Sequence, residues 1–147
     1  MSLLLLSCLF STFAMTGLIW LIQMVSYPLL ARVGPDRFAD YEQAHCRRIS
    51  FVVLPLMLTE LVTSLALAIR VPVELSADEA QQGLRVAAVL AVLIWVSTFA
   101  LQVPAHHRLE AGFDQKTWQF LVRSNWIRTM LWTARSAILI WLLANHG

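Results

Sequence analysis

The sequence has few charged residues: only 14% of its 147 residues are Asp, Glu, Lys or Arg. An average soluble protein carries about 25% charged residues, whereas 59% of this chain is hydrophobic and its mean hydropathy is +0.67. The net charge of +2 is too small to predict a nucleic-acid partner. We therefore expect membrane lipids, rather than water, to surround most of the chain.

Cysteine is scarce too, and basic residues are missing from the first part of the chain. Cys8 lies near the start of the first apolar run and Cys46 lies beyond its end, so along a helix they are roughly 30 Å or more apart. That separation excludes a disulfide within one chain. The first basic residue is Arg32, and the run before it is about twice as long as a signal-peptide core. We expect this run to remain as a transmembrane helix.

Four apolar segments are long enough to cross a membrane, which takes roughly 20 residues. We predict helices at about residues 3–31, 37–69, 82–110 and 115–144, in a single integral membrane domain over residues 1–147. The predicted fold is all-α, a four-helix transmembrane bundle. Seven basic residues lie in or beside the first and third connections: Arg32, Arg37, Arg47, Arg48, Arg108, Lys116 and Arg123. By the positive-inside rule these connections face the cytoplasm and both termini lie outside.

The two halves of the chain share a pattern of polar residues, written Q-x3-[YH], G-x-D and [HN]-x2-R. It comprises Gln23, Tyr27, Gly34, Asp36, His45 and Arg48 in the first half, and Gln102, His106, Gly112, Asp114, Asn125 and Arg128 in the second. The repetition predicts two similar helical hairpins. Asp36 and Asp114 are the expected N-caps of the second and fourth helices.

Polar side chains inside membrane spans usually face the bundle interior and mark functional sites. We therefore expect the repeated polar residues to converge near the cytoplasmic face. The candidate catalytic residues are His45, His106 and Tyr27. The candidate substrate-binding residues are Gln23, Arg48, Gln102, Asn125 and Arg128.

Two chemistries are compatible with this cluster. Imidazole is a common ligand of transition metals, so His45 and His106 are candidate metal ligands, to which Glu42 and Glu110 could add carboxylates. Alternatively, the arginines and amides bind a lipophilic organic molecule and a histidine acts as general acid or base. Amides between membrane helices also serve as structural contacts alone.

Two charged residues lie deeper in the spans. Glu60 is in the middle of the second predicted helix, and Arg135 is about two turns into the part of the fourth that enters the bilayer. An unpaired charge in hydrocarbon is costly, so we predict a structural ion pair between them. The alternative is that Glu60 carries protons or binds a ligand.

Parts of the chain resemble a known group of proteins. The stretch "WLIQMVSYPLLARVGPDRFADYEQAHCRRISFVVLPLMLTELVT", with "QVPAHHRLEAGFD" and "RSNWIRTMLWTARS", resembles an uncharacterised family of short bacterial four-helix integral membrane proteins. The four helices and the N-x2-R pattern are also distantly similar to anthrone oxygenase-like membrane proteins. The resemblance implies a bacterial inner (cytoplasmic) membrane location and an oxygenase activity, and some members of the oxygenase-like family act on aromatic polyketides.

Three functions are compatible with the sequence. The first is an enzyme, metal-assisted or not, acting as an oxidoreductase or oxygenase on a lipophilic molecule. The second is an accessory or assembly subunit of a larger membrane complex. The third is a small transporter, which with four helices would need to form a homodimer. Because the polar residues gather at one end, the sequence favours a site over a pore.

Overall fold

The computed structural model describes residues 2–146 except Val73, Glu74 and Ser76. The first span consists of α1 (Leu3–Leu21), a π-helical turn (Ile22–Ser26) and α2 (Tyr27–Leu30), and the second is α3 (Pro35–Ile69). The third consists of α4 (Asp78–Ser97), a second π-helical turn (Thr98–Gln102) and α5 (Val103–Leu109), and the fourth is α6 (Gln115–His146). The described residues contain no strand, so the predicted all-α fold is confirmed.

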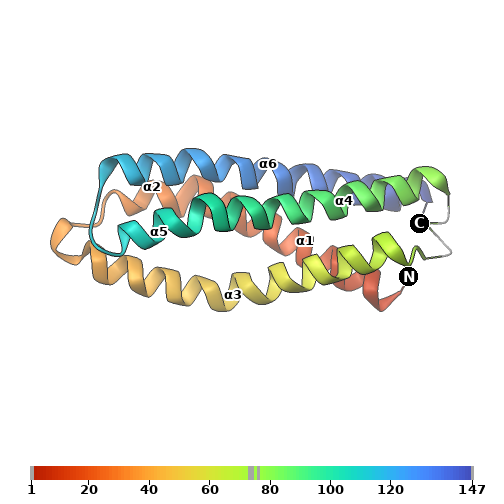
Figure 1. The fold of residues 1–147 in the computed structure, drawn as a ribbon, viewed down its shortest axis with the longest axis horizontal. Helices are drawn as coiled ribbons and strands as arrows, with labels where there is room; N and C mark the ends of the chain where they lie inside the picture. Colours follow the sequence, from red (N-terminus) through yellow and green to blue (C-terminus); the bar gives the residue numbers. More distant parts are fainter. Residues whose placement is uncertain (1, 73–74, 76, 147) are drawn as a thin grey trace.

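The four spans run along the long axis of the molecule (Figure 1). They contain 28 to 35 residues each, an 18-residue segment within each has a mean hydropathy between 1.3 and 2.3, and all are long and apolar enough to cross a membrane. The connections at residues 31–34 and 110–114 lie at one end of the bundle, which we call the turn end. Both termini and the connection between α3 and α4 lie at the other end, which we call the terminal end.

Two helix starts differ from the prediction. The third span begins at Asp78, four residues before the predicted position, and carries Asp78 and Glu79 in its first turn, where acidic groups interact favourably with the helix dipole. α3 begins at Pro35 with Gly34 as the N-cap. The prediction that Asp36 is the N-cap is wrong, because the fixed φ of proline suits the first helical position and starts the helix two residues earlier.

The predicted cap of the fourth span is confirmed. Asp114 precedes α6, and its Oδ2 accepts a hydrogen bond of 2.8 Å from the backbone N–H of Thr117. This bond lowers the pKa of the Asp114 carboxyl below its usual value, because it favours the charged form. The pair fixes the entry of the chain into α6 at the turn end.

The two π-helical turns have a common cause. Each ends two residues before a proline, Pro28 in the first span and Pro104 in the third, and each closes with an i to i+5 bond: the N–H of Tyr27 donates to Ile22 O, and that of Val103 to Thr98 O. A proline ring clashes with the carbonyl one turn earlier and has no N–H to bond it. The wider turn relieves this conflict, and π-helical turns of this kind are frequent at functional sites.

The bundle interior changes character along its length. At the terminal end it is apolar, with buried leucines and alanines from all four spans, including Leu5, Leu67, Leu84 and Leu139. From the turn end to just past its middle, α6 instead buries polar residues: Ser124, Asn125, Arg128, Thr129, Arg135 and Ser136. The polar interior therefore begins at the turn end and is closed at the terminal end.

Candidate functional site

A carboxylate, an imidazole and a phenol form a hydrogen-bonded chain near the turn end. Glu42 of α3 is fully buried, and its Oε1 lies 2.5 Å from Nδ1 of His106 on α5. The other nitrogen of that ring, Nε2, lies 2.9 Å from the hydroxyl of Tyr27, at the start of α2. Three spans thus contribute one residue each. The carboxylate fixes the orientation of the ring, and the ring can exchange a proton with the phenol.

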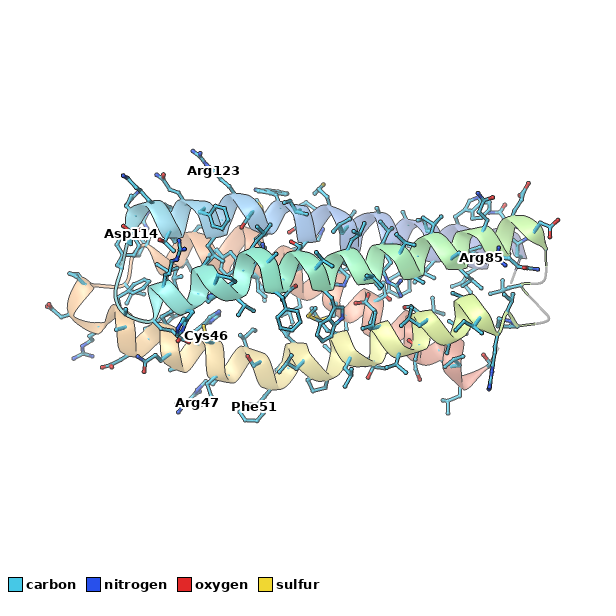
Figure 2. All side chains as sticks on the ribbon, in the orientation of Figure 1. Cys46, Arg47, Phe51, Arg85, Asp114 and Arg123 are labelled. Carbon is cyan, nitrogen blue, oxygen red and sulfur yellow. The ribbon has the colours of Figure 1, made fainter. Side chains whose placement is uncertain are left out.

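Cys46 stands beside this chain, one helical turn after Glu42. Its Sγ is 3.5 Å from both Glu42 Oε1 and His106 Nδ1. Figure 2 shows the Cys46 side chain pointing toward α5, whereas Arg47 points away from the bundle. The ligand atoms of Glu42, Cys46 and His106 all lie within 4.8 Å of one another, an arrangement that is able to hold a metal ion.

Arg128 brings a positive charge to the same region. Its side chain is buried, its Cζ lies 5.2 Å from the centre of the Trp132 ring, and its guanidinium interacts with the Tyr27 hydroxyl. A positive charge here favours negative charge on the phenol or on any bound group nearby.

A pocket of about 130 Å³ opens between α3 and the third span, next to this cluster. Its polar lining includes Tyr27, His45, Gln102, His106 and Arg128. The remaining lining is mostly apolar and comes from both sides of the opening: Ile49, Val53, Leu54, Met57, Trp95, Phe99 and Val103. Because several of these apolar residues are exposed on the outside of the bundle, the pocket is accessible from the lipid side.

Gln23 and Asn125 bond each other rather than facing the pocket. The Asn125 amide donates to Gln23 Oε1 at 2.8 Å, and the Gln23 amide donates to the carbonyl of Val122 at 3.2 Å. These contacts tie the first span to α6. Neither residue is among those that line the pocket.

Gln102 both bonds other side chains inside the bundle and borders the pocket. Its amide donates to Ser124 Oγ and its oxygen accepts from Ser97 Oγ, each at 3.2 Å, and it also borders the pocket.

Arg48 does not join the cluster, contrary to the prediction. It is exposed on the outer side of α3. The inward face of α3 at this level is set by Glu42 and Cys46, and residue 48 is rotated by about 200° from residue 46 on an α-helix. Arg48 instead borders a separate pocket on the outer side of α3, together with Tyr41 and His45.

His45 borders the cluster. Its ring stacks on Tyr41, with 6.3 Å between ring centres, and lies 6.3 Å from the centre of the His106 ring. The compact group with metal-ligand spacing therefore contains His106 together with Glu42 and Cys46. The sequence had indicated His45 in place of Cys46, and the spacing of four between Glu42 and Cys46 is the signal that identifies the inward face.

Glu60 and Arg135 form a separate polar centre near the middle of the bundle. Arg135 Nε lies 2.9 Å from Glu60 Oε1, and the Trp132 indole N–H reaches both carboxylate oxygens, at 3.1 and 2.9 Å. The guanidinium also donates to groups on the other spans: Thr12 Oγ1, Cys8 Sγ, Ser64 Oγ and the Ala87 carbonyl. All four spans meet at this arginine.

The two polar centres differ in how completely they are bonded. Of the buried polar atoms in the described chain that have no hydrogen-bond partner, three belong to the turn-end region: Glu42 Oε2, Asn125 Oδ1 and Arg128 Nε. Neither Glu60 nor Arg135 contributes such an atom. Buried unpaired polar atoms are costly and call for an explanation. The contrast makes the turn-end cluster, rather than the Glu60–Arg135 pair, the stronger candidate for a binding site.

Comparisons with known proteins add no assignment. No protein-family model, no curated protein and no solved structure matches the chain.

Proposed function

We propose that this chain is an integral membrane enzyme that binds a lipophilic molecule carrying an oxygen-bearing ring and transfers protons at that oxygen. One observation carries the proposal: His106, oriented by Glu42 and bonded to Tyr27, forms part of the wall of a pocket that opens toward lipid. A positioned imidazole that titrates near neutral pH is the side chain most often used for such transfers.

The size and lining of the pocket support a substrate with one ring and an apolar tail. A cavity of about 150 Å³ in another protein holds a benzene molecule, and this pocket measures about 130 Å³. The residues at its mouth include Leu54, Phe99 and Val103, which are exposed on the lipid-facing side. A tail would therefore leave the pocket into the bilayer while the ring remains beside His106.

The polar lining supports specific roles in the chemistry. Arg128 stabilises negative charge that develops on the ring oxygen, as preorganised charges do in enzyme sites. Tyr27 and His106 donate or accept the proton, and Glu42 acts as a positioning residue for the imidazole. Proton transfer at ring oxygens accompanies quinone reduction, in which an external reductant would supply the two electrons, and it agrees with the oxidoreductase or oxygenase class implied by the sequence resemblance.

A quinone titration tests this proposal. Decylubiquinone would be added to the full chain in nanodiscs, and binding would be followed by quenching of Trp95, whose ring lines the pocket. We expect saturable quenching that is largely lost in Trp95→Phe. Arg128→Met should weaken binding by about tenfold or more, which corresponds to about 1.4 kcal/mol. Non-saturable quenching, or equal affinity in Arg128→Met, would refute the proposed pocket.

Neighbouring histidines supply a matched control for the chemistry. His106 is part of the wall, whereas the adjacent His107 side chain is 86% exposed and contacts only Glu110 among the bonded groups described for it. The readout is reduction of decylubiquinone by the chain in nanodiscs with an added dithiol, which supplies the two electrons; His106→Gln should lower turnover strongly and His107→Gln should leave it unchanged. Equal loss in both variants would argue against His106 as the proton-transfer group.

We also propose that the turn end faces the cytoplasm of a bacterial inner membrane, with both termini outside. The support is the distribution of basic residues: seven lie at or near the turn end, and Arg70 and Arg85 lie toward the terminal end. Single cysteines at positions 37 and 116, in a chain lacking Cys8 and Cys46, can be labelled with a membrane-impermeant reagent. Labelling from the outside of intact cells would reverse the proposed orientation.

The closed terminal end supports a site over a transport path. The apolar cluster there includes Leu5, Leu67, Leu84 and Leu139, each at most 6% exposed. A continuous aqueous route from the turn end would have to pass this cluster, so the polar interior is better suited to binding than to conduction.

A further inference from the structure

The turn-end cluster holds three different metal-binding groups in one small volume. Glu42 and Cys46 are four residues apart on α3 and so lie on one face of that helix. His106 comes from α5, on another span. Two ligands one helical turn apart, completed by a residue from elsewhere in the fold, is a common way to build a metal site. The ligand atoms already lie within 4.8 Å of one another.

Charge explains why an ion would be stable there. A divalent cation with one carboxylate, one thiolate and one neutral imidazole gives a site with no net charge, which removes most of the cost of burying the separate ions. Without the cation, Glu42 is fully buried and its Oε2 has no hydrogen-bond partner among the described residues. A metal ion would supply the missing interaction.

We propose that Glu42, Cys46 and His106 bind one divalent transition-metal ion of borderline softness, of the Zn²⁺ and Co²⁺ class. Mixed nitrogen, sulfur and oxygen ligands suit such ions, and three protein ligands leave a fourth position for water or substrate. His106 also lines the pocket, so the metal site and the organic pocket share a wall. His45, which the sequence had suggested as a ligand, lies outside the set.

The ligand set also indicates how the proposed enzyme would work. With the ion bound through Nδ1 of His106, Nε2 remains directed at Tyr27, as it is in the structure. The metal would then act as a Lewis acid toward an oxygen of the ring, while the Nε2 proton of His106 and the Tyr27 hydroxyl would still serve proton transfer and Arg128 would stabilise the negative charge. This inference deepens the proposed function, but metal binding itself is measured without any organic molecule.

Cobalt spectroscopy tests the inference directly. The full chain in detergent, stripped with a chelator, would be titrated with Co²⁺ alone. We expect about one ion per chain and the near-ultraviolet charge-transfer band that a thiolate–cobalt bond produces. Cys46→Ser should abolish the band and weaken binding by more than about 100-fold, above the range typical of outer-shell changes. Cys8→Ser is the matched control and should retain both.

Histidine variants separate the proposed ligand set from its alternatives. His106→Gln should lose Co²⁺ binding, whereas His107→Gln and His45→Gln should retain it. If Co²⁺ binding survives Cys46→Ser but is lost in His45→Gln, the proposed ligand set is wrong and His45 is a ligand in place of Cys46. Equal loss of binding in His106→Gln and His107→Gln would indicate surface binding only. Gel filtration and circular dichroism of each variant would identify any that fails to fold, and Glu42→Gln then provides a second test of the set.

The two proposals can fail independently. If decylubiquinone saturably quenches the tryptophan fluorescence of the metal-free chain, but that chain takes up no Co²⁺, the metal inference is wrong and the proposed pocket is supported. If Co²⁺ binds with the expected band but the quinone does not, the metal site stands and the proposed substrate class is wrong.

Discussion

The Glu60–Arg135 pair makes a quantitative prediction about bundle stability. Both side chains are at most 1% exposed, and their charged atoms are 2.9 Å apart. Breaking a buried pair leaves the remaining charge without its partner, which costs about 3–5 kcal/mol. We therefore expect Arg135→Met and Glu60→Leu each to lower the free energy of unfolding by that amount.

The double variant should be much less damaged than the two single variants together. In the unsubstituted chain the Trp132 indole N–H reaches both Glu60 oxygens. With both charges removed, this N–H becomes the main unpaired group. An unsatisfied buried donor costs about 1–3 kcal/mol. The sum of the single effects is about 6–10 kcal/mol, so a double-mutant cycle should give a coupling energy of at least about 3 kcal/mol.

Reversible unfolding in mixed micelles with increasing dodecyl sulfate would measure all four chains of the cycle. Co²⁺ binding provides a second readout, because the metal ligands belong to the other polar centre. We expect the double variant to bind Co²⁺ as the parent chain does. A coupling energy below about 1 kcal/mol would show that the pair does not act as a buried ion pair.

Three further predictions concern contacts that hold the spans together. Asp114→Ala should lower the melting temperature at neutral pH but not near pH 2: the folded-state pKa of this carboxyl is lowered, so its stabilisation is present above the unfolded pKa and is lost as pH falls through the folded value. Trp118→Phe removes the 2.9 Å bond from its indole N–H to the Tyr27 carbonyl and should cost about 1 kcal/mol in the same unfolding assay; no change would mean that water replaces the bond. A double-mutant cycle with Gln23→Leu and Asn125→Leu should give a coupling of about 0.6–1.7 kcal/mol, and additive effects would contradict their direct contact.

The fold could be predicted because hydropathy determines it. Four runs long enough to cross a bilayer, separated by G-x-D turns and charged segments, leave few alternatives to a helical bundle. Helix starts were less predictable, because Asp36 and Asp114 follow similar glycines and only the proline at position 35 distinguishes them. The π-helical turns were not predicted, since the sequence shows the prolines but not which bonds are rearranged around them.

The candidate site was predicted only in part. Tyr27, His106 and Arg128 lie together as expected from the polar pattern, and the structure also places Arg135 against Glu60. Cys46 was considered only as a disulfide partner. Its role depends on which face of α3 points inward, and hydropathy does not determine that orientation when lipid and the bundle interior are both apolar.

The inward face of α3 was also misjudged at Arg48, which was predicted to point into the bundle. The H-x2-R spacing suggested that it shares the inward face with His45, but a rotation of α3 that directs Glu42 at His106 turns Arg48 outward. The amides at positions 23 and 125 lie at the same level along the bundle, as the sequence predicted, but they bond each other instead of lining the pocket. Depth follows from sequence position, whereas contacts follow from helix rotation.

The position of Arg135 in the chain has a consequence for how the protein is made. Glu60 and Arg135 are 75 residues apart, so the second span enters the membrane well before its charge partner is synthesised. An acidic residue at the centre of a span costs about 2.5–3.5 kcal/mol on insertion, which an 18-residue apolar segment with a mean hydropathy of 2.1 can offset. The last span has the least hydrophobic 18-residue segment of the four, with a mean hydropathy of 1.3, and it carries two buried arginines. We expect it to insert poorly alone and to depend on the first three spans, which already present the acceptors that Arg135 needs.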